Sequence, residues 1–307
     1  MTNIFLQEVL EGLARPQKSL SPKWLYDDEG SHLFEDITKV EEYYPTRTEA
    51  EIFKTALPET AEIIGADSIV VEYGSGSGKK TVALLNHLAP KTYHPVDIAE
   101  DFLKSAAQDL QTQFPDIHID PIVADFTDAA ALPSLEETEV PNLGFFPGST
   151  LGNLMPDEAT SFLTGTRHSL GEKSYFLLGV DLVKDISILE AAYDDAKGVT
   201  AAFNLNLLTR INRELGADFN RQNFKHRAMF NSEASRIEMH LVSQTDQTIH
   251  ISEQEFHFAE GETLHTESSY KYTIDGVKTL ANQSGWVLHQ TWTDPKDWFG
   301  IFLLKSV

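Results

Sequence analysis

A glycine-rich turn, EYGSGSG at residues 72–78, is the segment whose composition and spacing most clearly indicate chemistry. It follows the β-branched run SIVV and precedes TVALLNHLA, which has helical periodicity. Glycines permit a tight turn and let the backbone approach a ligand closely. The dinucleotide pattern G-x-G-x-x-G would need glycine at position 79, which is Lys79. The turn therefore predicts a ligand site of another kind, with a flexible strand–helix turn as the alternative.

Two acidic residues follow the next two predicted strands. Asp97 ends the run YHPVD, 97 − 76 = 21 residues beyond Gly76, and Asp125 with Phe126 ends IHIDPIVADF. An acid in the first position accepts hydrogen bonds from ribose hydroxyls. An acid followed by an aromatic suits an adenine amino group and ring face. Each acid alone would more often cap a strand, but together they predict a nucleoside site at the carboxyl edge of a parallel sheet.

The elements that must position these residues alternate between strand and helix. From Asp67 to Asp181, short apolar runs are separated by helical stretches, which indicates an α/β domain with a parallel sheet. After Asp181 two helical stretches are followed by runs of period 2, which indicates a hairpin-rich α+β piece. Two more strands end the chain. We expect one domain over residues 48–182 plus 273–307 and another over 1–47 plus 183–272.

The N-terminal segment is predicted to be helical. SHLFEDITKV places Leu33, Phe34 and Ile37 on one stripe, and Thr48 with Glu51 fits a capping box that opens the next helix. Later in the chain, VTAAFNLNLLTRINRELG has the same periodicity and ends at a glycine suited to a C-cap.

Composition excludes several classes of function. The chain has 47 acidic and 24 basic residues, a formal net charge of −23, which repels nucleic acid and anionic membranes. It has no cysteine, so disulfides, thiolate zinc sites, cysteine nucleophiles and cysteine-bound iron–sulfur clusters are excluded. The sequence shows neither a signal peptide nor a run of about 18 apolar residues. We expect a cytoplasmic monomer that acts on a small molecule and binds no metal.

The pattern E-x-G-x-G-x-G resembles the first motif of class I methyltransferases, and the C-terminal strand pair is similar to the antiparallel ending of their sheet. The resemblance implies a class I, Rossmann-like α/β domain that binds S-adenosyl-L-methionine as the methyl donor. The cofactor-binding residues that it implies are Glu72, Gly74, Gly76, Gly78, Lys79, Asp97, Asp125, Phe126 and Gly148.

Longer segments carry a more specific resemblance. WLYDDEGSHLFEDITKVEEYYPTRTE, FFPGSTLGNLMPDEA, AYDDAKGVTAAFNLNLL, RIEMHL and LHTESSYKY, in this order over nearly the whole chain, resemble the histidine-specific methyltransferases of ergothioneine biosynthesis. The resemblance implies a methyltransferase domain with a discontinuous α+β substrate-binding domain. It also implies transfer of three methyl groups to the α-nitrogen of L-histidine, which gives hercynine.

The same resemblance assigns residues to the reacting end of the amino acid. Asn153, in STLGNL, would hold the α-amino and carboxylate groups, and Tyr43 and Tyr193 would close on the same end. The resemblance also places Tyr26 in the wall of the substrate site, and we group it with these three residues as catalytic. Without the resemblance, the tyrosines would be interpreted as half-buried packing residues.

The side chain of the substrate is assigned to a second group. Phe34 would line the wall of the substrate site, and Met239 would pack near the substrate's side chain. Glu267 and Ser269 would recognise the imidazole. Glu267 and Ser269 stand at i and i+2 on a predicted strand and therefore share a face. Without the resemblance, Met239 would be interpreted as core and Glu267 as an exposed acid.

Three other functions remain open at this stage. One is methylation of another aromatic amino acid, tryptophan or tyrosine. A second is an NAD-dependent oxidoreductase, which Lys79 disfavours. The third is a metal-binding or interaction protein, because the chain has 11 histidines, although His250, His257 and His265 lack a recognised ligand spacing.

Overall fold

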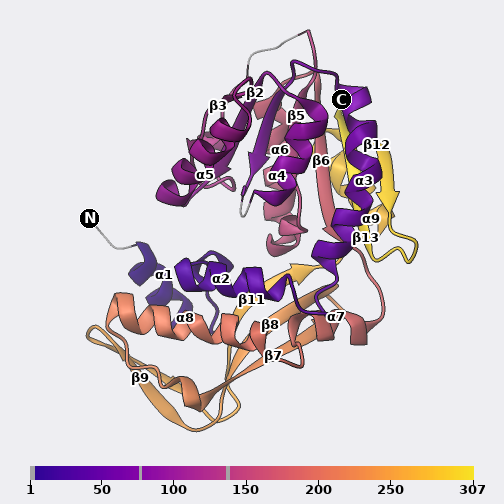
Figure 1. Cartoon of the computed structure of the whole chain (residues 1–307). Coiled ribbons are helices and arrows are strands. Elements are labelled where there is room, and N and C mark those ends of the chain that lie inside the picture. The colour runs from indigo at the N-terminus through magenta and orange to yellow at the C-terminus, as the bar shows by residue number, and fades with distance from the viewer. Residues whose placement is uncertain (1–3, 76–77, 136–138) are drawn as a thin grey trace. The chain divides into compact units, whose positions relative to one another are not determined.

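The computed structural model describes residues 4–75, 78–135 and 139–307, which divide into two compact units (Figure 1). The α/β unit comprises Pro45–Val183 and Tyr272–Val307, and the α+β unit comprises Met1–Tyr44 and Lys184–Lys271. The chain thus leaves the α+β unit after Tyr44, returns to it at Lys184 and leaves it again after Lys271. The assignment of S-adenosyl-L-methionine to the α/β unit and of the substrate to the α+β unit stays a prediction.

The α/β unit is built on a mixed sheet with strand order β12-β13-β6-β5-β1-β2-β3, and β4 pairs with β2 beside β3. The pairs from β6 to β3 are parallel, and β13 and β12 are added antiparallel. This confirms the predicted Rossmann-like α/β class. The strands are β1 (Ile69–Tyr73), β2 (Thr92–Asp97), β3 (His118–Ile119), β4 (Ile122–Val123), β5 (Asn142–Phe146), β6 (Ser174–Asp181), β12 (Trp286–Thr293) and β13 (Phe299–Ser306).

Helices cover both faces of this sheet, so its central strands β5 and β6 are buried along their whole length. One apolar core lies under α3, α4 and α5, and another lies under α6 and α9. The helical elements of the unit are α3 (Pro45–Ile64), α4 (Lys79–Leu88), α5 (Glu100–Gln113), η2 (Ala129–Ala131), η3 (Thr150–Asn153), α6 (Pro156–Leu170) and α9 (Ile274–Gln283).

Two local expectations were wrong. Helix α3 begins at Pro45, not after Thr48, because proline is well suited to the first helical position, where its missing N–H is not needed. The run 117–126 forms two short strands, β3 and β4, because Pro121 separates them and cannot donate to the ladder.

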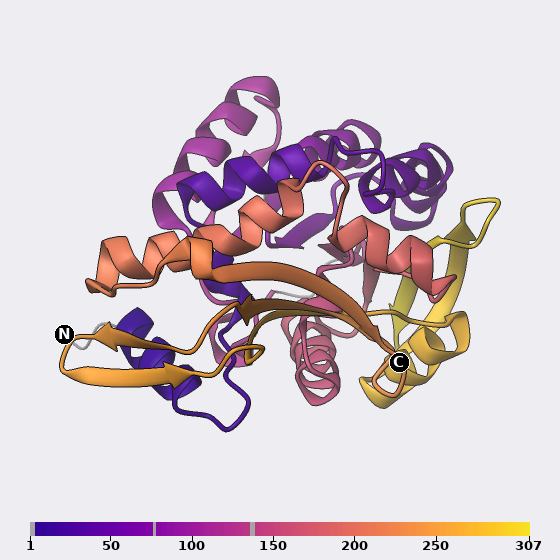
Figure 2. The same ribbon diagram turned by 90° about the horizontal axis from the view of Figure 1, so that it is seen from below.

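The α+β unit contains an antiparallel sheet of order β11-β8-β7 and a hairpin of β9 and β10. Figures 1 and 2 show α8 lying along this sheet, and it contacts β7 and β8. The elements are α1 (Ile4–Leu13), η1 (Pro22–Leu25), α2 (Asp28–Ile37), α7 (Ile186–Tyr193), α8 (Val199–Leu215), η4 (Arg221–Asn223), β7 (Phe224–Asn231), β8 (Arg236–Ser243), β9 (Gln247–Ile251), β10 (Gln254–Phe258) and β11 (Thr263–Tyr270).

A β-bulge in β11 decides which side chains face the interior of this unit. The register against β8 shifts between His265 and Glu267, so Thr266 is the extra residue. Its hydroxyl donates to the carbonyl of Met239 at 3.0 Å. Beyond the bulge, Glu267 lies opposite Met239, and Ser269 lies on the same face. Without the extra residue, strict alternation would turn Glu267 and Ser269 to the other face of the sheet.

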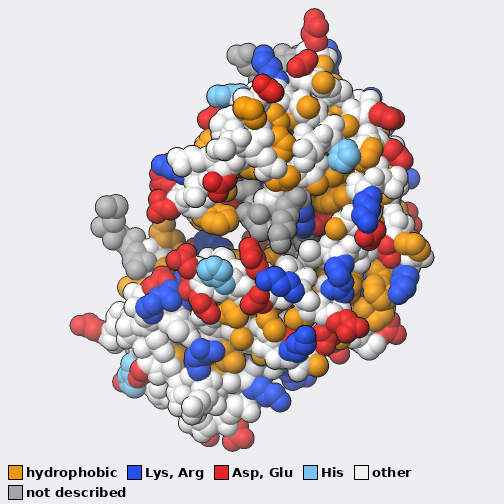
Figure 3. Space-filling view, viewed as in Figure 1, with side chains coloured by type: hydrophobic (Ala, Val, Ile, Leu, Met, Phe, Trp, Pro, Cys, Tyr) orange, Lys and Arg blue, Asp and Glu red, His pale blue; other side chains and the backbone are white. Residues whose placement is uncertain are grey.

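None of the helices in the described ranges is both long and apolar enough to cross a bilayer. On the face drawn in Figure 3, Asp and Glu side chains are spread widely, with Lys and Arg side chains between them.

We predict that Asp27→Ala destabilises the α+β unit, because Asp27 is the N-cap of α2. Its carboxylate accepts from the Gly30 amide at 2.8 Å and from Asn206 and Arg213 of α8 at 2.8 and 2.7 Å. The expected loss in the free energy of unfolding is about 1–2 kcal/mol, measured by urea titration. Glu35→Ala, an exposed change in the same helix, is the control, and an equal loss in both variants contradicts the prediction.

Candidate functional site

The glycine turn lies at the carboxyl edge of the sheet in the α/β unit. Gly74 follows β1 with φ +73° and donates its N–H to Val96 of β2 at 2.8 Å. Gly78 has φ +71° and is the N-cap of α4, and a Cβ there would meet no atom within 4 Å. The turn therefore has a left-handed backbone at both ends and open space beside Gly78. Gly76 lies outside the described residues, and Lys79 is described only as the first residue of α4.

Glu72 holds the start of α4 against the sheet. It is 1% exposed, and one of its carboxylate oxygens accepts from Tyr93 of β2 at 2.6 Å and Thr81 of α4 at 2.7 Å. Burial raises the pKa of Glu72 to about 7, against the opposing effect of these two donors. These contacts explain why an acid stands next to the last residue of β1, whether or not it also reaches a ligand.

The two predicted acids lie at the same edge, Asp97 as the last residue of β2 and Asp125 just after β4. Asp97 accepts from the Ala99 amide at 3.0 Å, and burial raises the pKa of its carboxyl above the usual value. Asp125 accepts from the amide and hydroxyl of Thr127 at 3.0 and 2.6 Å. The Phe126 ring lies against Gly74, where a Cβ would stand 3.4 Å from it. The parallel strands thus bring three predicted cofactor residues to one edge.

The loop after β5 is held in an uncommon conformation. Gly148 and Ser149 have φ of +83° and +62°, and the Ser149 hydroxyl accepts from the Asp181 amide at 2.9 Å. The Gly148 amide donates to Glu49 of α3 at 2.6 Å. Asn153 ends η3, directly after this loop, and is half-buried.

Sequence reasoning missed two residues at this edge, Glu49 and Lys80. Glu49 is fully buried and pairs with the ammonium of Lys80, which lies close to Gly148. A buried carboxylate thus joins α3, α4 and the loop after β5, and keeps a cation beside the glycine turn. The E-A-E-I pattern in a helix gave no signal for this role, because Glu49 would be interpreted as a solvent-facing acid.

Aromatic rings gather in the α+β unit from helices α2, α7 and α8 and from the loop positions Tyr26 and Tyr43. The distances between ring centroids are 5.6 Å for Tyr26 and Phe34, 6.3 Å for Phe34 and Tyr43, and 6.1 Å for Tyr43 and Tyr193, and all three pairs meet edge to face. Phe203 of α8 completes the group at 5.4 Å from Tyr26. The structure therefore brings four predicted residues together and adds Phe203. We call these five rings the aromatic cluster.

Tyr26 links the aromatic cluster to the sheet. Its side chain is 39% exposed, yet the pKa of its hydroxyl is raised well above 10, first by burial of that group and then by Glu267, Tyr43 and Tyr193.

Polar side chains occupy the sheet face that these rings approach. Glu267 is 7% exposed and Ser269 is 2% exposed, on the same face as Met239, which is 2% exposed. One carboxylate oxygen of Glu267 is buried and accepts no hydrogen bond from any residue in the described ranges. Burial raises the pKa of Glu267 to about 7, against the Lys271 ammonium, which lowers it. Such an oxygen is suited to an N–H donor supplied by a ligand.

Lys271, directly after β11, is a third residue that sequence reasoning missed. It is 3% exposed and donates to the hydroxyls of Tyr193 at 2.9 Å and Ser269 at 2.7 Å, and its ammonium lies 4.6 Å from the centre of the Tyr193 ring. The signal was present, because Glu267 and Ser269 of β11 and Lys271 just after it stand at every second position.

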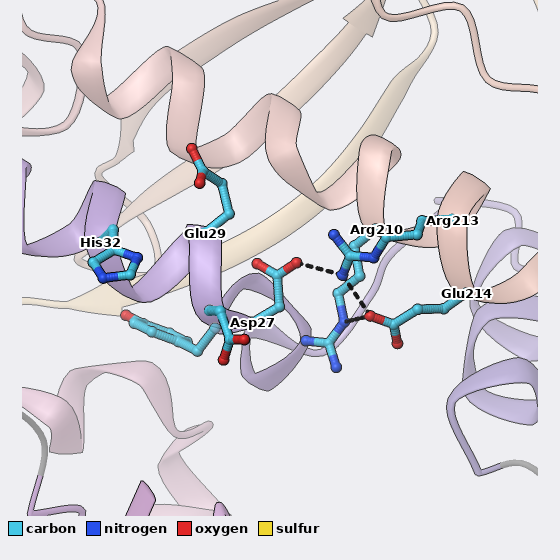
Figure 4. A pocket seen from close by; sticks show the side chains of 8 residues that line it. Asp27, Glu29, His32, Arg210, Arg213 and Glu214 are labelled. Atoms are coloured by element: carbon cyan, nitrogen blue, oxygen red, sulfur yellow. Dashed lines mark hydrogen bonds and ion pairs between the residues drawn. The ribbon is translucent and has the colours of Figure 1, made fainter.

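A cavity of about 660 Å³ lies beside Tyr26, between α2 and α8 (Figure 4). Its charged side chains pair with one another: Arg213 with Asp27 and with Glu214, both at 2.7 Å. The cavity is also lined by Asp28, Glu29, His32 and Arg210. Since its arginines already have acidic partners, we assign no ligand to it. Within the described ranges, no three His, Asp or Glu side chains are grouped so that they could hold a metal ion.

The two units therefore offer different chemistry. The edge of the α/β unit presents glycine backbone, two acids and an aromatic ring, a set that suits a nucleoside. The α+β unit presents an acid with an unpartnered oxygen next to tyrosine faces, which suits a ligand carrying both a ring N–H and a positive charge.

Comparisons with known proteins agree with this chemistry. The model of a family described as histidine-specific, S-adenosylmethionine-dependent methyltransferases matches residues 5–306. The histidine N-alpha-methyltransferase of Mycolicibacterium smegmatis is 41% identical over 309 residues, 97% of this chain and 93% of its own. The protein of the same name from Mycobacterium tuberculosis is 39% identical over 307 residues, with the same coverage.

The fold has a counterpart among solved structures. The crystal structure of the PH0226 protein from Pyrococcus horikoshii OT3 aligns with 92% of this chain and over 100% of the PH0226 chain. The TM-score is 0.51 and the sequence identity is 14%. At that identity the likeness concerns the fold alone.

We predict that Glu267→Gln changes how stability depends on pH. A carboxyl whose pKa rises from 4.5 to about 7 on folding stabilises the folded state below pH 4.5 and loses that contribution as the pH rises through 7. Between pH 5 and pH 8, the wild type should lose on the order of 2–3 kcal/mol relative to the variant in urea unfolding. Parallel pH profiles for the two proteins contradict this, and exposed Glu253→Gln is the control.

Proposed function

Because the chain belongs to the family of histidine-specific, S-adenosylmethionine-dependent methyltransferases, we propose that it methylates the α-nitrogen of L-histidine three times and yields hercynine. Hercynine formation is the first step of ergothioneine biosynthesis, the pathway that the sequence resemblance implies. The observation that carries the choice of histidine is the buried Glu267 oxygen, which lacks a donor from the described chain and lies by the aromatic cluster.

The edge of the α/β unit fits the methyl donor. Asp97 suits the ribose hydroxyls, Asp125 the adenine amino group and Phe126 the adenine ring face. Open space at Gly78 leaves room for a ligand against the backbone. The bound sulfonium supplies an electrophilic methyl group. Lys80, held by Glu49 beside Gly148, provides a cation suited to a carboxylate.

The face of β11 fits a neutral imidazole. The Glu267 carboxylate would accept from the ring N–H, and the Ser269 hydroxyl would donate to the other ring nitrogen. Histidine binding therefore favours the ionised form of a carboxyl whose pKa in the free protein is about 7. Met239, beside Glu267, offers an apolar contact to the ring.

The reaction needs an uncharged amine, because its lone pair forms the new bond to carbon while the bond from carbon to sulfur breaks. S-Adenosylhomocysteine leaves, and the proton that the nitrogen then carries passes to water before the next transfer. We assign Asn153, Tyr43 and Tyr193 to holding the amine and carboxylate. Orientation of this kind contributes up to about 7–11 kcal/mol in well-ordered systems.

The aromatic cluster supports repeated transfer, because each methyl group makes the nitrogen more apolar and the third gives it a permanent positive charge. Tyrosine faces attract methylated ammonium groups by about 0.5–2 kcal/mol. Tyr26, Tyr43 and Tyr193 each meet a neighbouring ring edge to face, so the aromatic cluster offers several rings close to one another. Water near the amine can then leave as the methyl groups fill its place.

Mass spectrometry of L-histidine incubated with the protein and S-adenosylmethionine tests the proposed function. We expect product masses for one, two and three added methyl groups, with the trimethylated species accumulating last. A parallel set of free amino acids should include tryptophan and tyrosine. Methylation of either of these in preference to histidine would contradict the choice of substrate while leaving the reaction class intact.

We predict that Glu267→Ala loses most activity on histidine, by at least about a hundredfold in kcat/KM, because the ring N–H then faces an apolar site. The same change should relax selection toward larger aromatic amino acids. Steady-state kinetics with histidine and tryptophan measure both effects, with exposed Glu253→Ala as the matched control. Wild-type turnover of histidine by the Glu267→Ala variant refutes the role of this carboxylate.

A further inference from the structure

Lys271 closes a triangle of hydrogen bonds with two residues of the proposed substrate site. Its ammonium donates to the Tyr193 and Ser269 hydroxyls at 2.9 and 2.7 Å, and the two hydroxyl oxygens lie 2.8 Å apart. All three residues are buried, with exposed fractions of 3%, 8% and 2%. The proposed function uses Tyr193 and Ser269 but leaves Lys271 without a role.

The triangle restricts where the two hydroxyl protons can point. An ammonium donates and cannot accept, so neither proton can be directed at Lys271. Tyr193 and Ser269 have one hydroxyl proton each, and one of these two protons lies between their oxygens. Consequently only one of the two hydroxyls can donate its proton to a group outside the pair. That hydroxyl is the one whose oxygen accepts the hydrogen bond from the other.

A neutral imidazole selects one of the two arrangements. When its N–H is bonded to Glu267, its second nitrogen needs a donor, and Ser269 supplies it. The proton between the hydroxyls must then come from Tyr193. Tyr193 therefore directs its proton toward Ser269 and away from the substrate amine. The amine lone pair is left for the methyl group, because a hydroxyl that donated to it would compete with the transfer.

We propose that Lys271 is a positioning residue that fixes the direction of the hydrogen bond between Tyr193 and Ser269, and so couples recognition of the imidazole to the state of the amine. The inference rests on the proposed function, since it takes the imidazole at Ser269 and the amine at Tyr193. It makes Lys271 part of substrate selection without contact to the reacting atoms.

The backbone of Lys271 is held independently of its side chain. Its amide donates to the Ser235 carbonyl at 2.8 Å, and its carbonyl accepts from the Ser235 hydroxyl at 2.9 Å. Substitution of the side chain should therefore leave β11 in register. This separates the effect on hydrogen-bond direction from an effect on the fold.

A double-mutant cycle on Lys271 and Ser269 tests the proposal by steady-state kinetics with histidine. We expect Lys271→Met to lower kcat by about tenfold and to change KM much less, since the loss concerns the reactive state of the amine. In the Ser269→Ala background, the hydroxyl pair no longer exists, so Lys271→Met should lower kcat by less than about twofold. Equal losses in both backgrounds overturn the proposal, because they mean that Lys271 acts independently of Ser269.

A second pair of variants tests the donor-only property itself. The Arg side chain in Lys271→Arg donates without accepting, whereas the Gln side chain in Lys271→Gln can accept a hydroxyl proton through its carbonyl. We expect Lys271→Arg to retain at least about threefold more kcat than Lys271→Gln, as a rescue by the conservative change. The reverse order contradicts the proposal and remains measurable if Lys271→Met fails to fold.

Two controls separate this inference from the proposed function. Lys225→Met removes an exposed lysine from β7 of the same sheet and should keep wild-type kinetics. Calorimetry with S-adenosylhomocysteine should give a Kd within about twofold of wild type for every Lys271 variant that folds. Absence of methylated histidine with the wild type refutes the proposed function, whereas an active wild type with an additive cycle refutes only the role of Lys271.

Discussion

The buried carboxylate of Glu267 is the constraint on which the α+β unit depends. An acceptor withdrawn from water and left without a donor costs about 1–3 kcal/mol, and its pKa of about 7 reflects the same cost. A folded chain keeps such a group only if its surroundings hold it in place. Here the bulge at Thr266 turns Glu267 inward, and the ammonium of Lys271 on the same face partly offsets its charge.

The α/β unit satisfies a different constraint, the close approach of a backbone to a large ligand. Its glycines and acids follow parallel strands, so the topology alone gathers them at one edge. Glu49 then fixes the loop after β5 through the Gly148 amide. A cation is held beside that loop by the same carboxylate, so a structural contact also sets the electrostatics of the edge.

The features that the sequence predicted rest on periodic patterns along the chain, whereas the features that it missed each depend on a single residue. Alternating apolar runs predicted the α/β sheet, and the strand-end acids Asp97 and Asp125 lie where the pattern placed them. The bulge at Thr266 could not be predicted, because a register shift depends on the partner strand and leaves no local periodicity. Lys271 was missed for a related reason. A lysine is expected at the surface unless the tertiary structure supplies acceptors such as Tyr193 and Ser269.

Burial distinguishes the parts of the site that many proteins can share from the part that selects a substrate. A glycine turn binds through backbone geometry, which any sequence with the same strand order can reproduce, and this is consistent with a likeness in fold at 14% identity. Reading an imidazole requires side-chain donors and acceptors in a fixed direction, which only a dry site can enforce. The face of β11 is such a site, because Glu267, Ser269 and Lys271 are each less than a tenth exposed. We therefore propose that substrate choice in this chain is a property of the α+β unit, and we expect a change there to alter which amino acid is bound without altering the cofactor edge.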